Sequence, residues 1–436
     1  MKLSARLAAT LVAVPALLAS ACLTEPDATD EPEVGTASAA ATITTILRNG
    51  VHFPNGAHFP NGVYFPNSAY APAGTHPDGS TGAVLQNVHI RAGTLDGLTA
   101  PDPIQNGESL TGGRVIDGSL AMTSPTRGVL TNAQLAGTAM KAKLYGPSSA
   151  FIDVRIESAV QAADPTPTWW CSPTWPYACT NLSVNEHADV WRFALSAYSP
   201  SHYEWVGFSK RLVLGSWQPL CPNGARAVVT AGRWRIGQRA DGLLLDLGHD
   251  ETVDTSGLAT FSCEDTGPIA KCVYAGYKPW KTWSRGYWRY DGITNQWQWV
   301  SKTDSGLDYL RACVRMVRAD YCGNGESNTV NGTWIDPIDR MGVVGGYQSL
   351  AWGTEAEWST DGASCVSTAR IAALQPWAST TDPRYLKCRQ TYERSQALIA
   401  TGTACGTQDQ VDAQWYTGAD PGRWTLLANR SEYIAP

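Results

Sequence analysis

The segment LDYLRACVRMVRADYCG (residues 307–323) carries the strongest structural signal in the chain, because a helical pattern meets two cysteines in it. Apolar residues recur there every three or four positions, at Leu307, Leu310, Val314 and Val317. Arg311, Arg315 and Arg318 fall on the opposite face. The spacing predicts a helix over Leu307–Arg318, with Cys313 beside its apolar face and Cys322 just after its end.

The cysteine count indicates an oxidising compartment. The chain has 11 cysteines, an odd number, and a modified Cys22 would leave ten that can pair. We expect five disulfides among Cys171, Cys179, Cys221, Cys263, Cys272, Cys313, Cys322, Cys365, Cys388 and Cys405. Short bridges between Cys171 and Cys179, Cys263 and Cys272, and Cys313 and Cys322 are plausible. No C-x-x-C pair occurs, so a zinc site is not expected.

The other elements predict a mainly β, α+β domain stapled by disulfides. A second helix is expected over Tyr385–Ala400, ending near Gly402. Short apolar runs punctuated by Gly, Pro and Asn-Gly indicate strands at Ala225–Trp234, Leu243–Leu247 and Trp288–Val300. We place this cysteine- and tryptophan-rich domain at residues 150–436.

The first residues have the layout of a secretory signal. Lys2 and Arg6 precede an apolar run from Leu7 to Leu18, and we expect a signal peptide over residues 1–21. The following residues resemble a bacterial lipobox, which implies lipid on Cys22 and a cell-envelope or outer-membrane lipoprotein. Ala19-Ser20-Ala21 also suits ordinary signal peptidase, which would give a secreted protein. Residues 22–48, acidic and rich in Ala, Thr, Ser and Pro, are expected to form a disordered tether.

A repeat region is predicted over residues 49–145. Four six-residue units run from Asn49 to Pro72, and a period of five follows from Leu85 to Met140. The period resembles that of pentapeptide-repeat proteins, which implies a small β-solenoid; a loop-rich β segment with accidental spacing is the alternative. His52 and His58 give way to tyrosine in the later units, so a metal site is not expected there.

Several strings in the larger domain occur together. The helix and its end read Cys313-Val-Arg-Met-Val-Arg-Ala-Asp-Tyr-Cys322-Gly, followed by Gly332-Thr-Trp-Ile-Asp-Pro-Ile-Asp339. Cys263, Ala270-Lys-Cys-Val and Gly276-Tyr-Lys-Pro-Trp280 precede them, and Trp358 and Gly362-Ala-Ser-Cys365-Val follow. Together they resemble the ADYC-domain family, found mainly in exported proteins of myxobacteria. The resemblance covers roughly residues 150–430; it implies a cysteine-rich exported domain and brings no catalytic residues.

One acidic cluster is the candidate site. Asp320, Glu326, Asp336 and Asp339 lie close in sequence. Two carboxylates could serve as acid and base in glycoside hydrolysis, or oxygen ligands could hold Ca²⁺. Alternatively, Asp320 caps turn amides at the end of a helix, and Asp336 before Pro337 belongs to a turn.

Charge and aromatic content narrow the partner class. The net charge of −6 and the lack of a basic stripe argue against a nucleic-acid partner. All 18 tryptophans lie between Trp169 and Trp424; most are expected in the core, but Trp169-Trp170, Trp175-Pro-Tyr177 and Trp288–Trp299 could form a glycan platform. We therefore expect a lipid-anchored surface protein with a glycan or protein partner and no cofactor, more a binding module than an enzyme. The alternatives are a secreted glycan-directed hydrolase and a structural surface scaffold.

Overall fold

The structure is a computed structural model of the 436-residue chain. It describes residues 47–49, 85–95, 107–144, 151–162, 189–199, 202–206, 209–213, 216–221, 224–238, 244–249, 257–264, 267–291, 293–329, 333–339, 354–370, 385–400 and 426–431. The chain divides into two units, residues 1–41 and 42–436, and all described residues belong to the second. The signal peptide, Cys22, Cys171, Cys179, Cys405 and the six-residue units after Asn49 lie outside the described residues.

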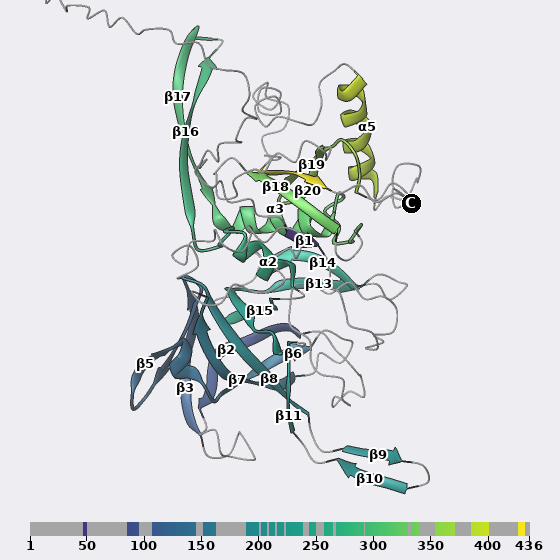
Figure 1. The fold of residues 1–436 in the computed structure, drawn as a ribbon. Helices are drawn as coiled ribbons and strands as arrows, with labels where there is room; N and C mark the ends of the chain where they lie inside the picture. The colour runs from purple at the N-terminus through teal and green to yellow at the C-terminus, as the bar shows by residue number, and fades with distance from the viewer. Residues whose placement is uncertain are drawn as a thin grey trace, which may run out of the picture. The chain divides into compact units, whose positions relative to one another are not determined.

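An antiparallel sheet of ten strands forms the first of two structural regions (Figure 1). Its strands are β2 (Leu85–Leu95), β3 (Glu108–Ile116), β4 (Ser119–Ser124), β5 (Gly128–Thr131), β6 (Thr138–Leu144), β7 (Phe151–Gln161), β8 (Trp191–Ser199), β11 (Ser216–Pro219), β12 (Ala227–Ala231) and β15 (Leu258–Cys263). The order is β15-β12-β8-β7-β6-β2-β3-β4-β5, with β11 beside β8. Because β15 also pairs with β2, the path from β15 through β2 closes on itself as a barrel.

The barrel interior is apolar. Alternate residues of β7 point inward, so that Ile152, Val154 and Ile156 are buried while their neighbours are half-buried or exposed. Phe193 on β8 and Phe261 on β15 meet edge to face, with ring centroids 5.6 Å apart. These side chains belong to a hydrophobic core to which every strand of the closed path contributes residues.

Within residues 85–95 and 107–144, the period of five falls on antiparallel strands, and these ranges show no solenoid. Strands β2 to β6 pair antiparallel through hairpins, whereas a pentapeptide solenoid stacks its strands in parallel. Several of the five-spaced residues are buried in the barrel core, namely Ile90, Leu110, Leu120, Leu130, Leu135 and Met140. The spacing therefore marks inward positions on successive strands, and the described part fits the alternative of a β segment without a solenoid.

The boundary expected between residues 145 and 150 falls inside this sheet. Strand β6 ends at Leu144 and β7 begins at Phe151, and the two strands pair over five positions from Ala139–Arg155 to Lys143–Phe151. The repeat region and the start of the cysteine-rich domain consequently share one sheet and one core. A boundary there would cut a continuous hydrogen-bonded ladder.

The second region combines a five-stranded sheet with three helices. The sheet order is β1-β18-β21-β19-β20, with β1 (Leu47–Asn49), β18 (Thr333–Asp339), β21 (Leu427–Ser431), β19 (Thr354–Ser359) and β20 (Gly362–Val366). The helices are α2 (Pro268–Tyr274), α3 (Gly306–Arg318) and α5 (Leu386–Ala400). β1 lies at an edge of this sheet and includes Leu47 and Arg48, the last two residues of the expected tether.

Three hairpins complete the described secondary structure. They are β9 (His202–Val206) with β10 (Ser209–Val213), β13 (Trp234–Gln238) with β14 (Leu244–His249), and β16 (Thr282–Asp291) with β17 (Gln296–Ser305). A 3-10 turn, η1 (Asn132–Leu135), lies between β5 and β6. No helix in the described ranges is long and apolar enough to span a bilayer.

Both predicted helices are present, and α2 was missed. Ser305 caps α3 by accepting a hydrogen bond from the Leu307 backbone N–H, at 3.2 Å. Arg315 and Arg318, on the face opposite the apolar residues, are both buried because the chain after α3 folds back over them. Helix α2 has only seven residues, and Pro268 at its first turn was the available signal.

The disulfide framework is confirmed in part, with pairings longer in sequence than expected. Cys221 pairs with Cys263, Cys272 with Cys313, and Cys322 with Cys388. The proposed bridges between Cys263 and Cys272, and between Cys313 and Cys322, are therefore wrong. Cys313 is used to join α3 to α2, and Cys322, beyond the left-handed turn at Ala319, joins the following loop to α5. Cys365 is also disulfide-bonded.

Candidate functional site

Asp320 is the centre of the predicted acidic cluster, and it lies where α3 ends. Ala319 has left-handed backbone angles, φ 51° and ψ 42°, which turn the chain out of the helix. Asp320 is fully buried there and accepts hydrogen bonds from the backbone N–H groups of Asn324, at 3.1 Å, and Gly325, at 2.9 Å. It therefore caps turn amides, as the structural interpretation predicted.

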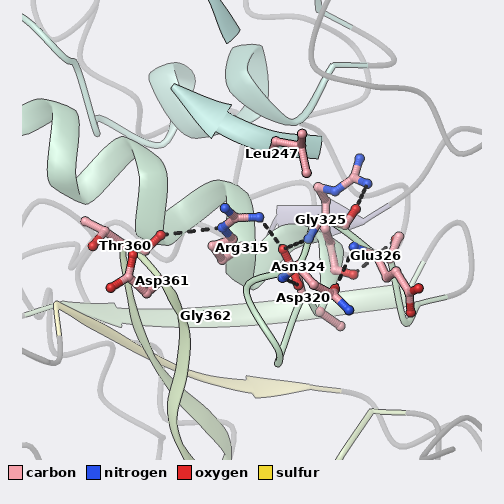
Figure 2. A network of polar contacts seen from close by, with 12 residues as sticks. Leu247, Arg315, Asp320, Asn324, Gly325, Glu326, Thr360, Asp361 and Gly362 are labelled. Atoms are coloured by element: carbon pink, nitrogen blue, oxygen red, sulfur yellow. Dashed lines mark hydrogen bonds and ion pairs between the residues drawn. The ribbon is translucent and has the colours of Figure 1, made fainter. Parts of the chain in front are cut away.

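Arg315 supplies the counter-charge to Asp320. Its guanidinium forms a buried ion pair with Oδ2 of Asp320, and its Nε points to the backbone carbonyl of Thr360 (Figure 2). Arg318, one turn further on, donates from Nη2 to the carbonyl of Gly325 at 2.8 Å. The two arginines on the polar face of α3 thus hold the returning loop instead of facing water.

The loop itself has room only for glycine at one tight point. Gly323 has φ +66°, and a Cβ there would lie 1.7 Å from the Asp361 carbonyl oxygen. The loop therefore passes directly against the turn between β19 and β20, where the Ala363 N–H donates to the Tyr321 carbonyl at 3.0 Å. This close approach explains the glycine that follows Cys322.

Glu326 has a different partner from Asp320. Its carboxylate accepts a hydrogen bond from the Tyr385 hydroxyl, at 2.8 Å, and its side chain is buried. Tyr385 immediately precedes α5, which the Cys322–Cys388 disulfide also ties to this loop. Glu326 therefore fixes α5 against the end of α3, and its oxygens do not converge with those of Asp320 on a shared ligand.

A second buried charge pair contacts the last turn of α3. Arg370 and Glu355 are both buried and form a bidentate pair, with two N–O distances of 3.0 Å. Arg370 also donates to the carbonyls of Met316 and Val317 and to the Thr329 hydroxyl, at 3.0–3.2 Å. One guanidinium thus satisfies the last carbonyls of α3 and connects them to the sheet.

Tyr321 and Trp358 extend this network into the sheet. The Tyr321 hydroxyl donates to Glu355 and accepts from the Arg370 backbone N–H, each at 2.8 Å. Burial, followed by the charge of Glu355, raises the pKa of Tyr321 well above its usual value, so the hydroxyl stays protonated. The Trp358 ring stacks on Tyr321, and its N–H donates to Asn429, which in turn donates to Glu355 at 2.7 Å.

Asp336 and Asp339 lie in a strand, so the predicted turn at Asp336-Pro337 is wrong. Both belong to β18, where Asp336 is opposite Arg430 and Asp339 opposite Leu427 on β21. Pro337 is opposite Asn429 on β21, while β1 pairs only with Thr333–Ile335 on the other edge of β18. Within the described ranges, no group of three His, Cys, Asp or Glu side chains is arranged to hold a metal ion.

The burial and contacts of the acidic residues suit a structural role better than acid–base catalysis. A general acid or base must reach a substrate proton, whereas Asp320 is fully buried and engaged by an arginine and two backbone amides. Sequence reasoning found Asp320 and Glu326 but missed Glu355 and Arg370. Nothing in their local sequence marks them, since each lies among short polar stretches without a periodic pattern.

The comparisons with known proteins agree with the signature around α3. No curated protein and no solved structure matches the chain. A family model described as the ADYC domain matches residues 132–372, which is more than half of the chain and includes the strands of the closed barrel from β6 onward as well as α2, α3 and both buried charge networks. The chain belongs to the ADYC-domain family.

Proposed function

We propose that the protein is exported, anchored by lipid on Cys22, and acts at the cell surface as a binding module. The disulfides are the observation that supports export. Three bridges join cysteines 41 to 66 residues apart, and Cys365 is disulfide-bonded as well. Structural disulfides of this kind persist in oxidising compartments and are rare in the bacterial cytosol.

A binding role is favoured over hydrolysis by the state of the acidic residues. Asp320 and Glu326, the best candidates for a catalytic pair, are buried and bound to Arg315 and Tyr385. The charged residues in and around the Ala319–Cys322 string instead stabilise the fold of this region. A rigid scaffold on a tether of about 25 residues can present loops and hairpins to a partner outside the cell.

The intact mass of the protein from its own membrane fraction tests this proposal. With Cys22 lipidated, the mass corresponds to a chain that starts at Cys22 and carries acyl groups, and ten thiols become alkylated only after reduction. An unmodified chain in the cytosolic fraction, or thiols that react without reduction, would overturn it. Protease treatment of intact cells provides the matched surface test, since a surface-anchored chain is digested and a periplasmic marker is not.

A further inference from the structure

The β16–β17 hairpin is a long ribbon that stands apart from both sheets. Each strand has ten residues, and the two pair along their full length from Thr282–Ser305 to Asp291–Gln296. Neither strand pairs with a third one in the part of the chain that the structure describes (Figure 1). The outer edges of the ribbon are therefore unpaired there, and exposed residues occur on both of its faces, among them Gln298 on one and Thr303 on the other.

The register divides the ribbon into two chemically different faces. Residues directly opposite each other share a face, and so do alternate residues of one strand. One face, here called the neutral face, consists of Thr282, Ser284, Gly286, Trp288, Tyr290, Trp297, Trp299, Ser301, Thr303 and Ser305. The other, the charged face, consists of Trp283, Arg285, Tyr287, Arg289, Asp291, Gln296, Gln298, Val300, Lys302 and Asp304. All five charged residues of the hairpin strands are on the second face.

Four aromatic residues are grouped at the outer half of the neutral face. Trp288 is opposite Trp299, and Tyr290 is opposite Trp297. Directly opposed residues have Cβ atoms about 5 Å apart, and alternate residues along a strand are about 7 Å apart. Toward the base, the same face carries only glycine, serine and threonine, and the described Thr282 and Thr303 are exposed.

The base of the ribbon is firmly mounted. The Gly306 N–H donates to the Lys281 carbonyl at 2.8 Å, which closes the open end of the hairpin. Immediately beyond it, Tyr277 stacks on Tyr309, and the Cys272–Cys313 disulfide joins α2 to α3. The far end is in solvent, since Ile293 in the turn is 94% exposed. A rigidly mounted ribbon can present a preformed surface, which lowers the entropic cost of binding.

We propose that the neutral face of the ribbon binds a neutral polysaccharide. Aromatic residues at neighbouring register positions of one face can stack on the apolar faces of successive sugar rings, and serine and threonine hydroxyls can exchange hydrogen bonds with sugar hydroxyls further along the chain. The absence of any charged residue from this face favours an uncharged glycan over an acidic one. It equally disfavours a nucleic acid, which requires cationic groups along its phosphates.

This inference rests on the proposed role as a binding module and names its ligand class. The test is a depletion assay, in which the full chain purified from its own cells is mixed with insoluble cellulose, chitin or starch. An alginate gel serves as the acidic probe. The expected result is saturable binding to at least one of the neutral polysaccharides and weaker binding to alginate.

Paired substitutions assign the binding to one face. Trp288→Ala with Trp299→Ala removes an opposed pair of the neutral face, and Tyr287→Ala with Val300→Ala removes the neighbouring opposed pair of the charged face. The first variant is expected to bind about tenfold more weakly or worse, as for a central aromatic hot spot, and the second as well as the unchanged chain. Trp288→Phe with Trp299→Phe, which keeps both rings, is expected to retain most of the binding even if the alanine pair unfolds the ribbon.

Four results would overturn the inference. They are no binding to any neutral probe, equal binding by the two alanine pairs, tighter binding to alginate, and loss of binding in the phenylalanine pair as complete as in the alanine pair at Trp288 and Trp299. A concentration-dependent dimer that the same alanine pair abolishes, without polysaccharide binding, would assign the face to a second copy of the chain. None of these results alters the mass of the lipidated N-terminus, so failure of this inference and failure of surface anchoring are separable.

Discussion

The barrel and the five-stranded sheet region bury their interiors in different ways. The barrel core is formed by aliphatic and aromatic side chains, with Cys221–Cys263 as its disulfide. The ion pairs of the barrel strands lie outside this core: Glu108–Arg127 is partly exposed, and Arg192–Glu264 is largely buried where Glu264 also accepts a hydrogen bond from the Tyr274 hydroxyl of α2. Around α3, the core also encloses two ion pairs, Arg315–Asp320 and Arg370–Glu355. The first region depends on alternating hydrophobicity, whereas the second depends on individual polar contacts.

This difference explains what the family signature encodes. Alternating apolar residues can be exchanged for one another with modest cost when volume is kept. A buried charge has no such freedom, because removing its partner leaves an uncompensated charge in the interior. The Ala-Asp-Tyr-Cys string supplies a helix-ending turn, a buried carboxylate, a hydroxyl for Glu355 and a cysteine for α5 in four consecutive positions.

The largest expected effect comes from breaking the Arg370–Glu355 pair. Arg370→Met should lower the free energy of unfolding by about 3–5 kcal/mol, because Glu355 stays buried without its counter-charge. The Met316 and Val317 carbonyls lose their donors as well. Urea denaturation followed by tryptophan fluorescence measures the change.

Arg127→Met is the matched control on the barrel. Arg127 also pairs with a glutamate, at 2.6 Å, but its side chain is half exposed. The expected loss is below about 1 kcal/mol, since exposed ion pairs contribute little. Equal losses for the two variants would contradict the difference between the regions.

The Cys322–Cys388 bridge has the next largest expected effect. Replacing both cysteines with alanine should lower the free energy of unfolding by about 2–4 kcal/mol, because the bridge closes a loop of 66 residues in the unfolded chain. Hydrogen exchange should then increase in α5 first, because α5 loses its covalent link to the loop after α3. The hydrogen bond from Tyr385, just before α5, to Glu326 in that loop would remain. Unchanged exchange in α5 would show that other contacts hold the helix.

Tyr321→Phe should produce a smaller loss, of about 1–2 kcal/mol, because one hydroxyl is removed from a buried network while the ring remains. Glu355 keeps its bonds from Arg370 and Asn429, so its charge stays compensated. Thermal unfolding monitored by circular dichroism is sufficient to detect the change. Stability equal to that of the unchanged chain would mean that the hydroxyl contributes nothing to the network.

The smallest effect is a pH dependence at the barrel surface. Hydrogen bonds from Ser124, Thr126 and Arg127 lower the pKa of Glu108 to about 2, from the usual 4.5 of a glutamate. A lowered carboxyl pKa adds stability that is present above pH 4.5 and is lost as the pH falls toward 2. Carboxyl NMR titration should place the Glu108 midpoint near 2, and Glu108→Gln should flatten this part of the stability profile. A midpoint near 4.5 would show that the three donors do not hold the carboxylate.

The sequence predicted the mainly β, α+β class and the helices α3 and α5, because period and turn residues are local signals. The spacing of five also marked several residues between positions 85 and 144 that are buried in the barrel core. Spacing alone, however, cannot distinguish hairpins from a solenoid. Pairing direction depends on contacts between distant strands, such as β2 with β15.

The candidate site was predicted less completely, for a physical reason. Helical periodicity placed Arg315 and Arg318 on the polar face but could not predict their burial, because a helix pattern contains no information on a loop that folds back over that face. The partner of Arg370 is 15 residues away, on strand β19, and disulfide partners are 41 to 66 residues apart. Such long-range pairs are not encoded in any window of neighbouring residues.

Substitution of Asp320 by asparagine tests most directly whether the Ala319–Cys322 string stabilises the fold and has no direct role in function. Asp320→Asn keeps the shape but leaves Arg315 buried without a counter-charge. We predict a loss of at least about 3 kcal/mol in the free energy of unfolding, with unchanged polysaccharide binding by the fraction that remains folded. A variant of unchanged stability that has lost binding or an enzymatic activity would contradict the account and identify Asp320 as a functional residue.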